Sequence, residues 1–172
     1  MFLNKSKKLF ILTDFYLFFY FNFIKDKKNP NSKFCSKTIN TILGKAWADF
    51  AFQLICFNHI DQICDKIGVG GVIRNIYSWR SKDIDYHDRQ IDLLIVRADQ
   101  MLNSCEIKFS KNEFEITEDD DEKMNRKVWT LVDEITSIAG IHITFISTFG
   151  IKQNAYWMDI QSEVVLEDLF KF

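Results

Sequence analysis

The chain has 172 residues, of which 47% are hydrophobic, a length and composition typical of one globular domain with at most a short appendage. A single proline and six glycines argue against a low-complexity or linker-rich protein. The formal net charge of −2 is not that of a general nucleic-acid binder, although residues 1–45 hold nine lysines against Asp14 and Asp26, and residues 118–122 form the acidic run EDDDE. Each charged run, taken alone, is most simply a solvated face.

An apolar segment, LFILTDFYLFFYFNFI, covers residues 9–24 behind a lysine cluster, as in a signal peptide or a membrane anchor. It is shorter than the ~20 apolar residues of a membrane span, and the charge of Asp14 is costly inside a bilayer. We therefore expect a buried amphipathic helix capped by Thr13 or Asp14, with no membrane contact. Residues 26–38 are polar, hold the only proline and mark the one domain boundary that the sequence offers.

Apolar residues at helical spacing predict a long helix over residues 43–67 that ends at Gly68. Cys56 and His59 stand three apart on it and could begin a metal site, but no second Cys/His pair follows at zinc spacing, so structural roles are favoured. The four cysteines form no C-x-x-C pair, and we expect reduced, buried thiols in a cytoplasmic protein.

Alternating patterns predict strands near residues 72–79, 90–97, 101–109 and 141–149, and the tail predicts a short strand followed by one helical turn. Residues 118–135 predict a helix with acids in its first turn, where the helix dipole favours them, and with Trp129 and Val132 in the core. The order of helix, three strands, helix and strand indicates an α/β fold, in which helices flank a mixed β-sheet.

The segment QIDLLIVRADQMLNSCEIKFS, residues 90–110, reads as two apolar strands around a polar turn, with a carboxylate in each strand. A turn centred on Asp99 makes the numbers of facing residues sum to 198, which sets Asp92 opposite Glu106 and Gln90 opposite Lys108. The two carboxylates then have Cβ atoms ~5 Å apart on one sheet face, which destabilises a buried sheet unless positive charge compensates. Lys108 supplies one such charge, and a divalent cation would supply the rest.

That arrangement suits phosphodiester hydrolysis, because hard oxygen ligands hold Mg²⁺, which polarises a phosphoryl oxygen and lowers the pKa of a bound water. The backbone carbonyl of Ile107 is a further candidate ligand, and Lys108 can orient the water or stabilise the developing charge. The alternative is a surface hairpin on which Gln90, Asp92, Glu106 and Lys108 are ordinary polar residues. Spacing alone does not decide between the two interpretations.

The pair QID at 90–92 and CEIKF at 105–109 resembles the core of the PD-(D/E)XK nuclease superfamily, which presents an Asp on one strand and E-x-K on the next. The segments AWADFAFQLICFNHIDQI, YSWRSK and ISTFGIKQNAYWMDIQSEVVLEDLF look like the nuclease-like C-terminal domain found after many prokaryotic AAA+ type ATPases. Residues 8–24 look like the end of the winged-helix region that joins the two domains there. The resemblance implies a restriction-endonuclease-like core over residues 39–172, preceded by a winged-helix or linker remnant over residues 1–38.

The same resemblance implies that Asp92 and Glu106 bind Mg²⁺ or Mn²⁺, that Lys108 is the catalytic lysine, and that Gln90 touches the nucleophile or the scissile phosphate of DNA. The family usually adds a helix carboxylate, and Gln53 stands at that position here. Its amide carries no charge, although its oxygen can still coordinate a metal or hold a metal-bound water. Weak or absent nuclease activity is therefore an alternative expectation.

The chain contains no G-x-x-x-x-G-K-[ST] motif, and GVGG at 68–71 lacks the lysine and hydroxyl that nucleotide phosphates require, so we expect no nucleotide binding. Beside ATPase relatives it would be a detached or truncated tail. Three hypotheses follow: a metal-dependent DNA nuclease, an inactive regulatory or docking domain for an ATPase partner, and a membrane-tethered protein, which the interrupted apolar segment disfavours. Arg80 is either a rim contact for a phosphate or a surface cation.

Overall fold

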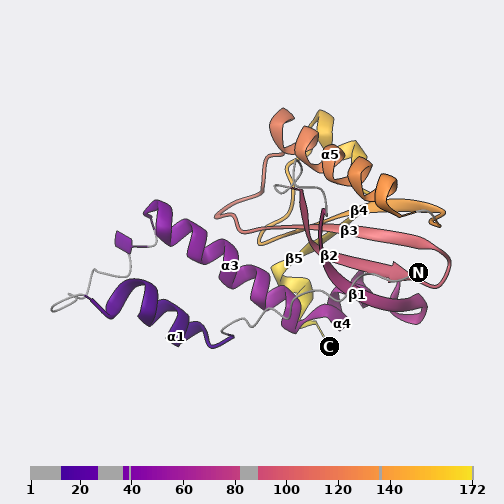
Figure 1. The fold of residues 1–172 in the computed structure, drawn as a ribbon. Helices are drawn as coiled ribbons and strands as arrows, with labels where there is room; N and C mark the ends of the chain where they lie inside the picture. Colours follow the sequence, from indigo (N-terminus) through magenta and orange to yellow (C-terminus); the bar gives the residue numbers. More distant parts are fainter. Residues whose placement is uncertain (1–12, 27–36, 39, 82–88, 136, 172) are drawn as a thin grey trace. The chain divides into compact units, whose positions relative to one another are not determined.

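The computed structural model describes residues 13–26, 37–38, 40–81, 89–135 and 137–171 (Figure 1). The chain divides into two compact units, Met1–Leu54 and Ile55–Phe172, and each is described by itself. The domain boundary expected between residues 38 and 39 stays a prediction.

The first unit contains helix α1 (Phe15–Phe19), which continues into the π-helical turn η1 (Tyr20–Ile24). Asp14 caps α1, because its carboxylate accepts a hydrogen bond of 2.7 Å from the backbone N–H of Leu17, which confirms one of the two expected caps. No side chain of α1 is buried, so the expected burial is wrong for this helix, whereas Phe23 of η1 is buried. Residues 9–12 lie outside the described residues. Within the described ranges, every helix is too short or too polar to cross a membrane.

The long helix expected over residues 43–67 is two helices, α3 (Ile42–Asn58) and α4 (Ile60–Lys66), interrupted at His59. The His59 backbone leaves helical geometry at φ −123° and ψ 33°. Gly68 ends α4 as expected, because its φ of +72° lies in the left-handed region that favours glycine. The 3₁₀ turn η2 (Gly70–Val72) then leads into the sheet.

The second unit is built on a five-stranded sheet of strand order β1-β2-β3-β4-β5. The strands are β1 (Ile73–Arg80), β2 (Gln90–Arg97), β3 (Met101–Lys108), β4 (Gly140–Ser147) and β5 (Ser162–Val165). The pairs β1–β2 and β2–β3 are antiparallel, whereas β3–β4 and β4–β5 are parallel. The mixed α/β fold predicted from the sequence is confirmed.

Helix α5 (Glu118–Glu134) makes the crossover that the parallel pair β3–β4 requires. Thr117 and Asp120 form a capping box at its start, and four acidic residues fill its first turn. Two short 3₁₀ helices, η4 (Ala155–Asp159) and η5 (Leu166–Phe170), flank β5. The expected tail of a strand and one helical turn is therefore correct.

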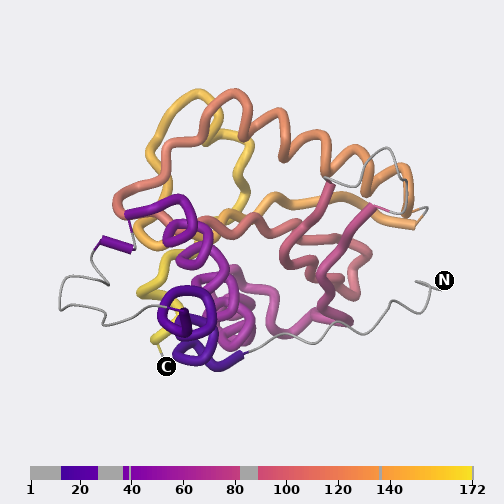
Figure 2. The backbone as a smooth tube through the Cα atoms, turned by 60° about the vertical axis from the view of Figure 1, so that its left-hand side comes forward, coloured from indigo at the N-terminus to yellow at the C-terminus, as the bar shows by residue number. Residues whose placement is uncertain are grey.

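Helix α5 runs along one face of the sheet (Figures 1 and 2). Leu131 of α5 packs with Leu94 and Leu102, and Met124 packs with Phe145, so this face carries two apolar clusters. Trp129 is 69% exposed and Val132 is 39% exposed, so the expected place of both residues in the core is wrong. Because residues alternate along a strand, the face under α5 is the one that holds Glu106 and Lys108.

Candidate functional site

The β2–β3 hairpin has the register that the sequence predicts. Leu93 pairs with Cys105 and Val96 pairs with Leu102, and both sums are 198. The loop closes with Gln100 at φ 65°, the left-handed residue of a three-residue turn. One step beyond the last pair, the same register sets Asp92 opposite Glu106.

Asp92 lies where the two strands stop exchanging backbone hydrogen bonds. Its Oδ2 accepts a bond of 3.4 Å from the backbone N–H of Ile107, so the carboxylate stands in the position of a strand partner. Burial raises the pKa of Asp92, and the nearby charge of Glu106 raises it further. Lys127, the Ile107 N–H and Lys108 offset only part of that rise. Asp92 is therefore a carboxylate held at an electrostatic cost.

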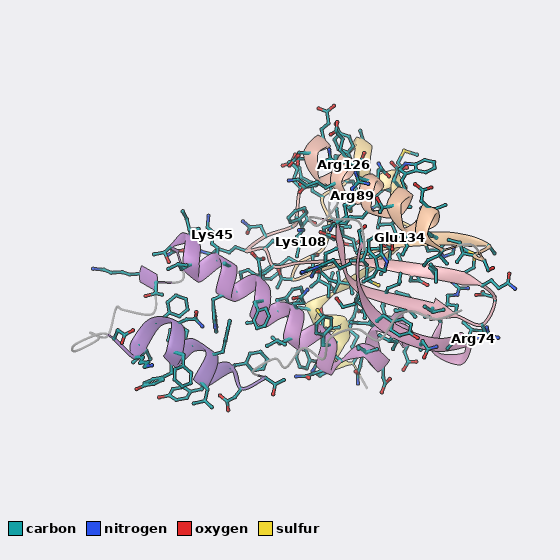
Figure 3. All side chains as sticks on the ribbon, in the orientation of Figure 1. Lys45, Arg74, Arg89, Lys108, Arg126 and Glu134 are labelled. Carbon is teal, nitrogen blue, oxygen red and sulfur yellow. The ribbon has the colours of Figure 1, made fainter. Side chains whose placement is uncertain are left out.

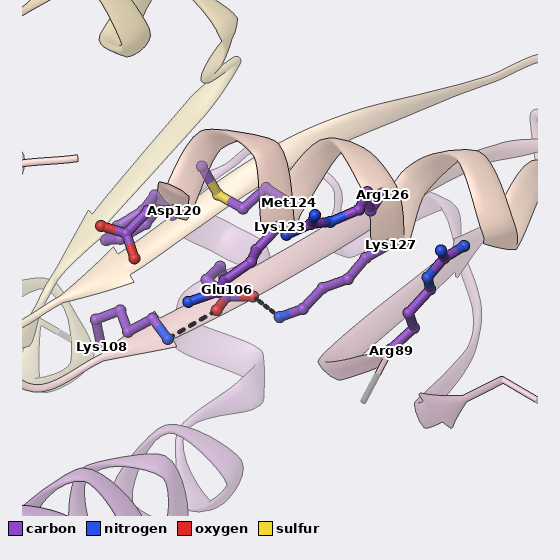
Figure 4. Close-up of a pocket in the computed structure, with 9 residues that line it drawn as sticks. Arg89, Glu106, Lys108, Asp120, Lys123, Met124, Arg126 and Lys127 are labelled. Atoms are coloured by element: carbon purple, nitrogen blue, oxygen red, sulfur yellow. Dashed lines mark hydrogen bonds and ion pairs between the residues drawn. The ribbon is translucent and has the colours of Figure 1, made fainter. Parts of the chain in front are cut away.

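Glu106 is 8% exposed and is held between two ammonium groups. Lys108 Nζ lies 2.9 Å from Oε1, and Lys127 Nζ donates to Oε2 at 2.7 Å (Figure 4). The like charges of Asp92 and Glu106 are thus compensated by two lysines. Sequence reasoning found only Lys108 and left the second positive charge to a metal ion.

Lys108 is half-buried beside the carboxylate pair. Burial by itself lowers the pKa of Lys108, but the charge and hydrogen bond of Glu106, together with the charge of Asp92, outweigh it and raise the pKa above its ordinary value. Lys108 is therefore an ammonium ion at neutral pH. It can donate hydrogen bonds and stabilise negative charge, but it is not a general base.

Lys127 is the functional residue that sequence reasoning missed. It lies on α5 with Lys123 and Arg126, and the spacing of three and four residues turns all three toward one side of the helix. That spacing is visible in the sequence, directly after the acidic first turn of the same helix. Only the crossover of α5 over β3 brings Lys127 to Glu106, and residue spacing does not give the rotation of that helix.

Two of the predicted accessory residues, Gln90 and Arg80, lie together at one edge of the sheet. Gln90 and Arg80 face each other across β1 and β2, and Arg80 Nη2 donates to Gln90 Oε1 at 2.6 Å. Gln90 thus accepts a hydrogen bond from the guanidinium group of Arg80. The contact of Gln90 with a nucleophile or a phosphate stays a prediction. Gln53 lies on α3 in the first unit, so its role as an accessory ligand stays a prediction as well.

The oxygen atoms around Asp92 fit a hard divalent cation. In a strand, the N–H and C=O of one residue point toward the same neighbour, so the Ile107 carbonyl faces Asp92 as its N–H does. Two carboxylates and a carbonyl are ligands that Mg²⁺ and Mn²⁺ prefer. No cluster of three or more His, Cys, Asp or Glu side chains occurs in the described part of the chain, and a two-carboxylate site falls below that size. A bound cation would compete with Lys127 for Glu106.

The alternative metal pair, Cys56 and His59, has structural contacts. Cys56 is completely buried, and burial raises the pKa of its thiol to about 12, which keeps it protonated and a poor ligand. The His59 ring packs edge-on against Phe170 at 4.9 Å between centroids. Cys56, Cys64 and Cys105 are free buried thiols as expected, and Cys35 lies outside the described residues.

A cavity of about 250 Å³ opens beside Glu106, between β3 and α5 (Figure 4). Its lining is dominated by cationic side chains from β3, from α5 and from the residue that precedes β2, with two carboxylates and two apolar residues among them. The cations are Arg89, Lys108, Lys123, Arg126 and Lys127; the carboxylates are Glu106 and Asp120; the apolar residues are Met124 and Phe145.

Comparisons of this chain with protein-family models, with curated proteins and with solved structures found no match. The geometry itself brings Asp92, Glu106 and Lys108 together on one sheet face. It adds Lys127 and a positively charged cavity, and it sets Gln90 with Arg80 at the edge of the same strands. Such a cluster can bind a cation at its carboxylates and an anion at its ammonium groups.

Proposed function

We propose that residues 39–172 form a PD-(D/E)XK nuclease-like domain that hydrolyses phosphodiester bonds of DNA with Mg²⁺ or Mn²⁺. The observation that supports the proposal is the meeting of Asp92, Glu106 and Lys108 in the register described above, with Lys108 Nζ 2.9 Å from Glu106. An ordinary surface hairpin does not bury a glutamate to 8% exposure opposite a second carboxylate.

The carboxylates of Asp92 and Glu106 and the carbonyl of Ile107 would hold the cation. When bound, the cation supplies Lewis acidity at a phosphoryl oxygen and neutralises negative charge there. Lys108, an ammonium ion beside both carboxylates, donates hydrogen bonds to a non-bridging oxygen and stabilises the charge that develops on it. The Ile107 N–H keeps the Asp92 carboxylate oriented between the strands.

The proposal is tested by nicking of supercoiled plasmid DNA with Mg²⁺. Lys108→Ala should lower the rate about 100- to 1,000-fold, the usual effect of removing one preorganised donor from a transition state. Lys152→Ala is the matched control, because Lys152 is an exposed lysine paired with Glu115 at 3.2 Å, and it should cleave like the wild type. Absence of cleavage by the wild type, or full activity of Lys108→Ala, would contradict the proposal.

A second function is a catalytically inactive regulatory or docking domain for an AAA+ ATPase partner. The contacts of Glu106 favour this second function, because each carboxylate oxygen of Glu106 already forms an ion pair with a lysine. Gln53, the neutral residue in place of a helix carboxylate, favours it too. A wild-type protein that neither binds Mn²⁺ nor cleaves DNA, and that associates with an ATPase chain, would support this function over hydrolysis.

A further inference from the structure

We propose that the cavity beside Glu106 is a binding pocket for a phosphate group. The assignment of that phosphate to DNA rests on the proposed nuclease function. The affinity of the pocket for phosphate is independent of that function, because the affinity follows from the charges of the cavity alone.

The charges of the lining point to an anion. Five cations face two carboxylates, which leaves three positive charges in excess around about 250 Å³. Lys108 and Lys127 compensate the charges of Glu106 and Asp92, so the excess lies with the remaining cations. These are Lys123 and Arg126 of α5 and Arg89, which directly precedes β2 and donates a hydrogen bond to Thr130. Field lines concentrate in such a cleft and raise the local concentration of a counter-charged ligand.

The present partners of the α5 cations are weak ones. Lys123 pairs with Asp119, and Arg126 lies 3.8 Å from Glu122. All four of these side chains are more than half exposed, and exposed pairs one helical turn apart contribute little to stability. Both cations can therefore turn from their helix neighbours to a ligand at small cost.

The chemistry of the pocket suits a phosphate group. Two of its cations are arginines, whose forked guanidinium groups bind phosphate oxygens in pairs. The cavity has the volume of about eight water molecules at ~30 Å³ each, enough for a phosphate and part of its ester group. Met124 and Phe145 give it an apolar wall against which a sugar can pack.

The phosphate can come from a DNA end or from within the strand, and the test separates the two sources. The full chain is titrated in EDTA, so that no hydrolysis occurs. The probes are a fluorescent single-stranded oligonucleotide with a 5′-phosphate and the same oligonucleotide with a 5′-hydroxyl, and inorganic phosphate is the competitor. Tighter binding of the phosphorylated probe identifies a terminal phosphate, and equal binding identifies an internal phosphodiester. Both outcomes support the pocket if phosphate competes.

The test variant is Lys123→Met with Arg126→Met, which removes two exposed cations of the pocket. The control is Lys152→Met with Arg74→Met, which removes the same charges elsewhere. Arg74 lies at the end of β1 that pairs with the hairpin end of β2, at the other end of the sheet from Arg126 (Figure 3). We expect the pocket variant to bind at least about tenfold more weakly and the control to change less than about twofold.

Equal losses in the two double variants, or no competition by inorganic phosphate, would overturn the pocket. The two proposals fail separately. A protein that nicks DNA with Mg²⁺ but binds phosphate equally well in the pocket variant keeps the nuclease function without the pocket. A protein that binds phosphate in the pocket but never cleaves DNA keeps the pocket without the nuclease function. Thermal unfolding of each variant verifies that the fold is retained.

Discussion

Two buried carboxylates of the second unit, Glu106 and Asp168, each contact two lysines, but their surroundings differ. The Glu106 side chain is 10% exposed and contacts Lys108 and Lys127, while the Asp168 side chain is 5% exposed and contacts Lys66 and Lys171. Composition alone, one acid and two lysines, does not distinguish them.

Their surroundings do. Asp168 also accepts a backbone hydrogen bond of 3.1 Å from Val165 at the start of η5. Burial by itself raises the pKa of Asp168, but the hydrogen bonds from Lys171, Val165 and Lys66 outweigh it, so the pKa is lowered. Its two lysines are 45% and 61% exposed on the surface. Asp168 therefore behaves as a structural clamp that holds η5 to α4.

Glu106 instead faces a second carboxylate, whose pKa is raised, and it lines a positively charged cavity. Its partner Lys127 is only 17% exposed. A structural ion pair needs neither a facing acid nor a cavity, so Glu106, and not Asp168, belongs to a candidate reactive site.

DNA cleavage should depend strongly on Glu106 and hardly at all on Asp168. Glu106→Gln should lower the Mg²⁺-dependent nicking rate at least about 100-fold, because it removes the charge of a ligand and the partner of Lys108. Asp168→Asn should retain the rate within about twofold once its folded fraction is taken into account. Plasmid nicking measures both. Similar losses in the two variants would mean that Glu106 is no more functional than Asp168.

The second prediction concerns the contribution of Asp168 to the stability of the fold. Asp168→Asn should lose about 1–2 kcal/mol of unfolding free energy at pH 7, because the ammonium groups of Lys66 and Lys171 lose the negative charge of their shared acceptor. A lowered pKa stabilises the fold above the ordinary value of 3.8, and that contribution disappears as the pH falls through the lowered pKa. Urea unfolding at pH 7 and at low pH measures it. A loss that persists unchanged in acid would contradict the ion-pair origin.

A third effect concerns Lys127 as a competitor for the metal site. Lys127→Met should raise the affinity for Mn²⁺ about tenfold, because it removes the ammonium group that lies 2.7 Å from Glu106. Lys152→Met is the control, since Lys152 pairs with Glu115 on the surface and does not line the cavity beside Glu106. Calorimetric titration gives both affinities. Weaker Mn²⁺ binding by Lys127→Met would show that this lysine supports the site and does not compete for it.

The smallest effect is a gain of stability. A carboxyl whose pKa is raised in the fold destabilises it at higher pH, so Asp92→Asn should add about 0.5–1 kcal/mol at pH 7. The gain should shrink as the pH falls through the raised pKa, and it should vanish below the ordinary value of 3.8, where the carboxyl is protonated in both the folded and the unfolded chain. Asp99→Asn should bring no gain, because Arg97 lowers the pKa of Asp99 through a side-chain hydrogen bond. Thermal unfolding against pH distinguishes the two.

The hairpin that holds the site was predictable from the sequence because its determinants are local. The polar turn between two apolar strands leaves one register that buries the apolar faces, and that register aligned Asp92 with Glu106. The strands, the capped crossover helix and the short tail follow from equally local patterns.

The predictions that were wrong concern features that depend on contacts between residues far apart in the sequence. The break at His59 interrupts a continuous apolar pattern, and helical spacing carries no sign of it. Trp129 is exposed because α5 turns Leu131 and Met124 to the sheet instead. The same rotation of α5 about its axis brings Lys127 to Glu106. The sequence does not predict that rotation, which explains both the wrong prediction for Trp129 and the absence of a prediction for Lys127.

Binding of Mn²⁺ to the full chain tests the metal-dependent site most directly. It is measured by electron paramagnetic resonance on the wild type, on Asp92→Ala with Glu106→Ala, and on Asp99→Ala with Glu115→Ala, which removes two exposed carboxylates. If Asp92 and Glu106 hold the cation, the wild type and the Asp99/Glu115 variant bind Mn²⁺ saturably and the Asp92/Glu106 variant does not. Equal binding by all three proteins, or none by the wild type, would contradict a metal site at the end of the β2–β3 hairpin.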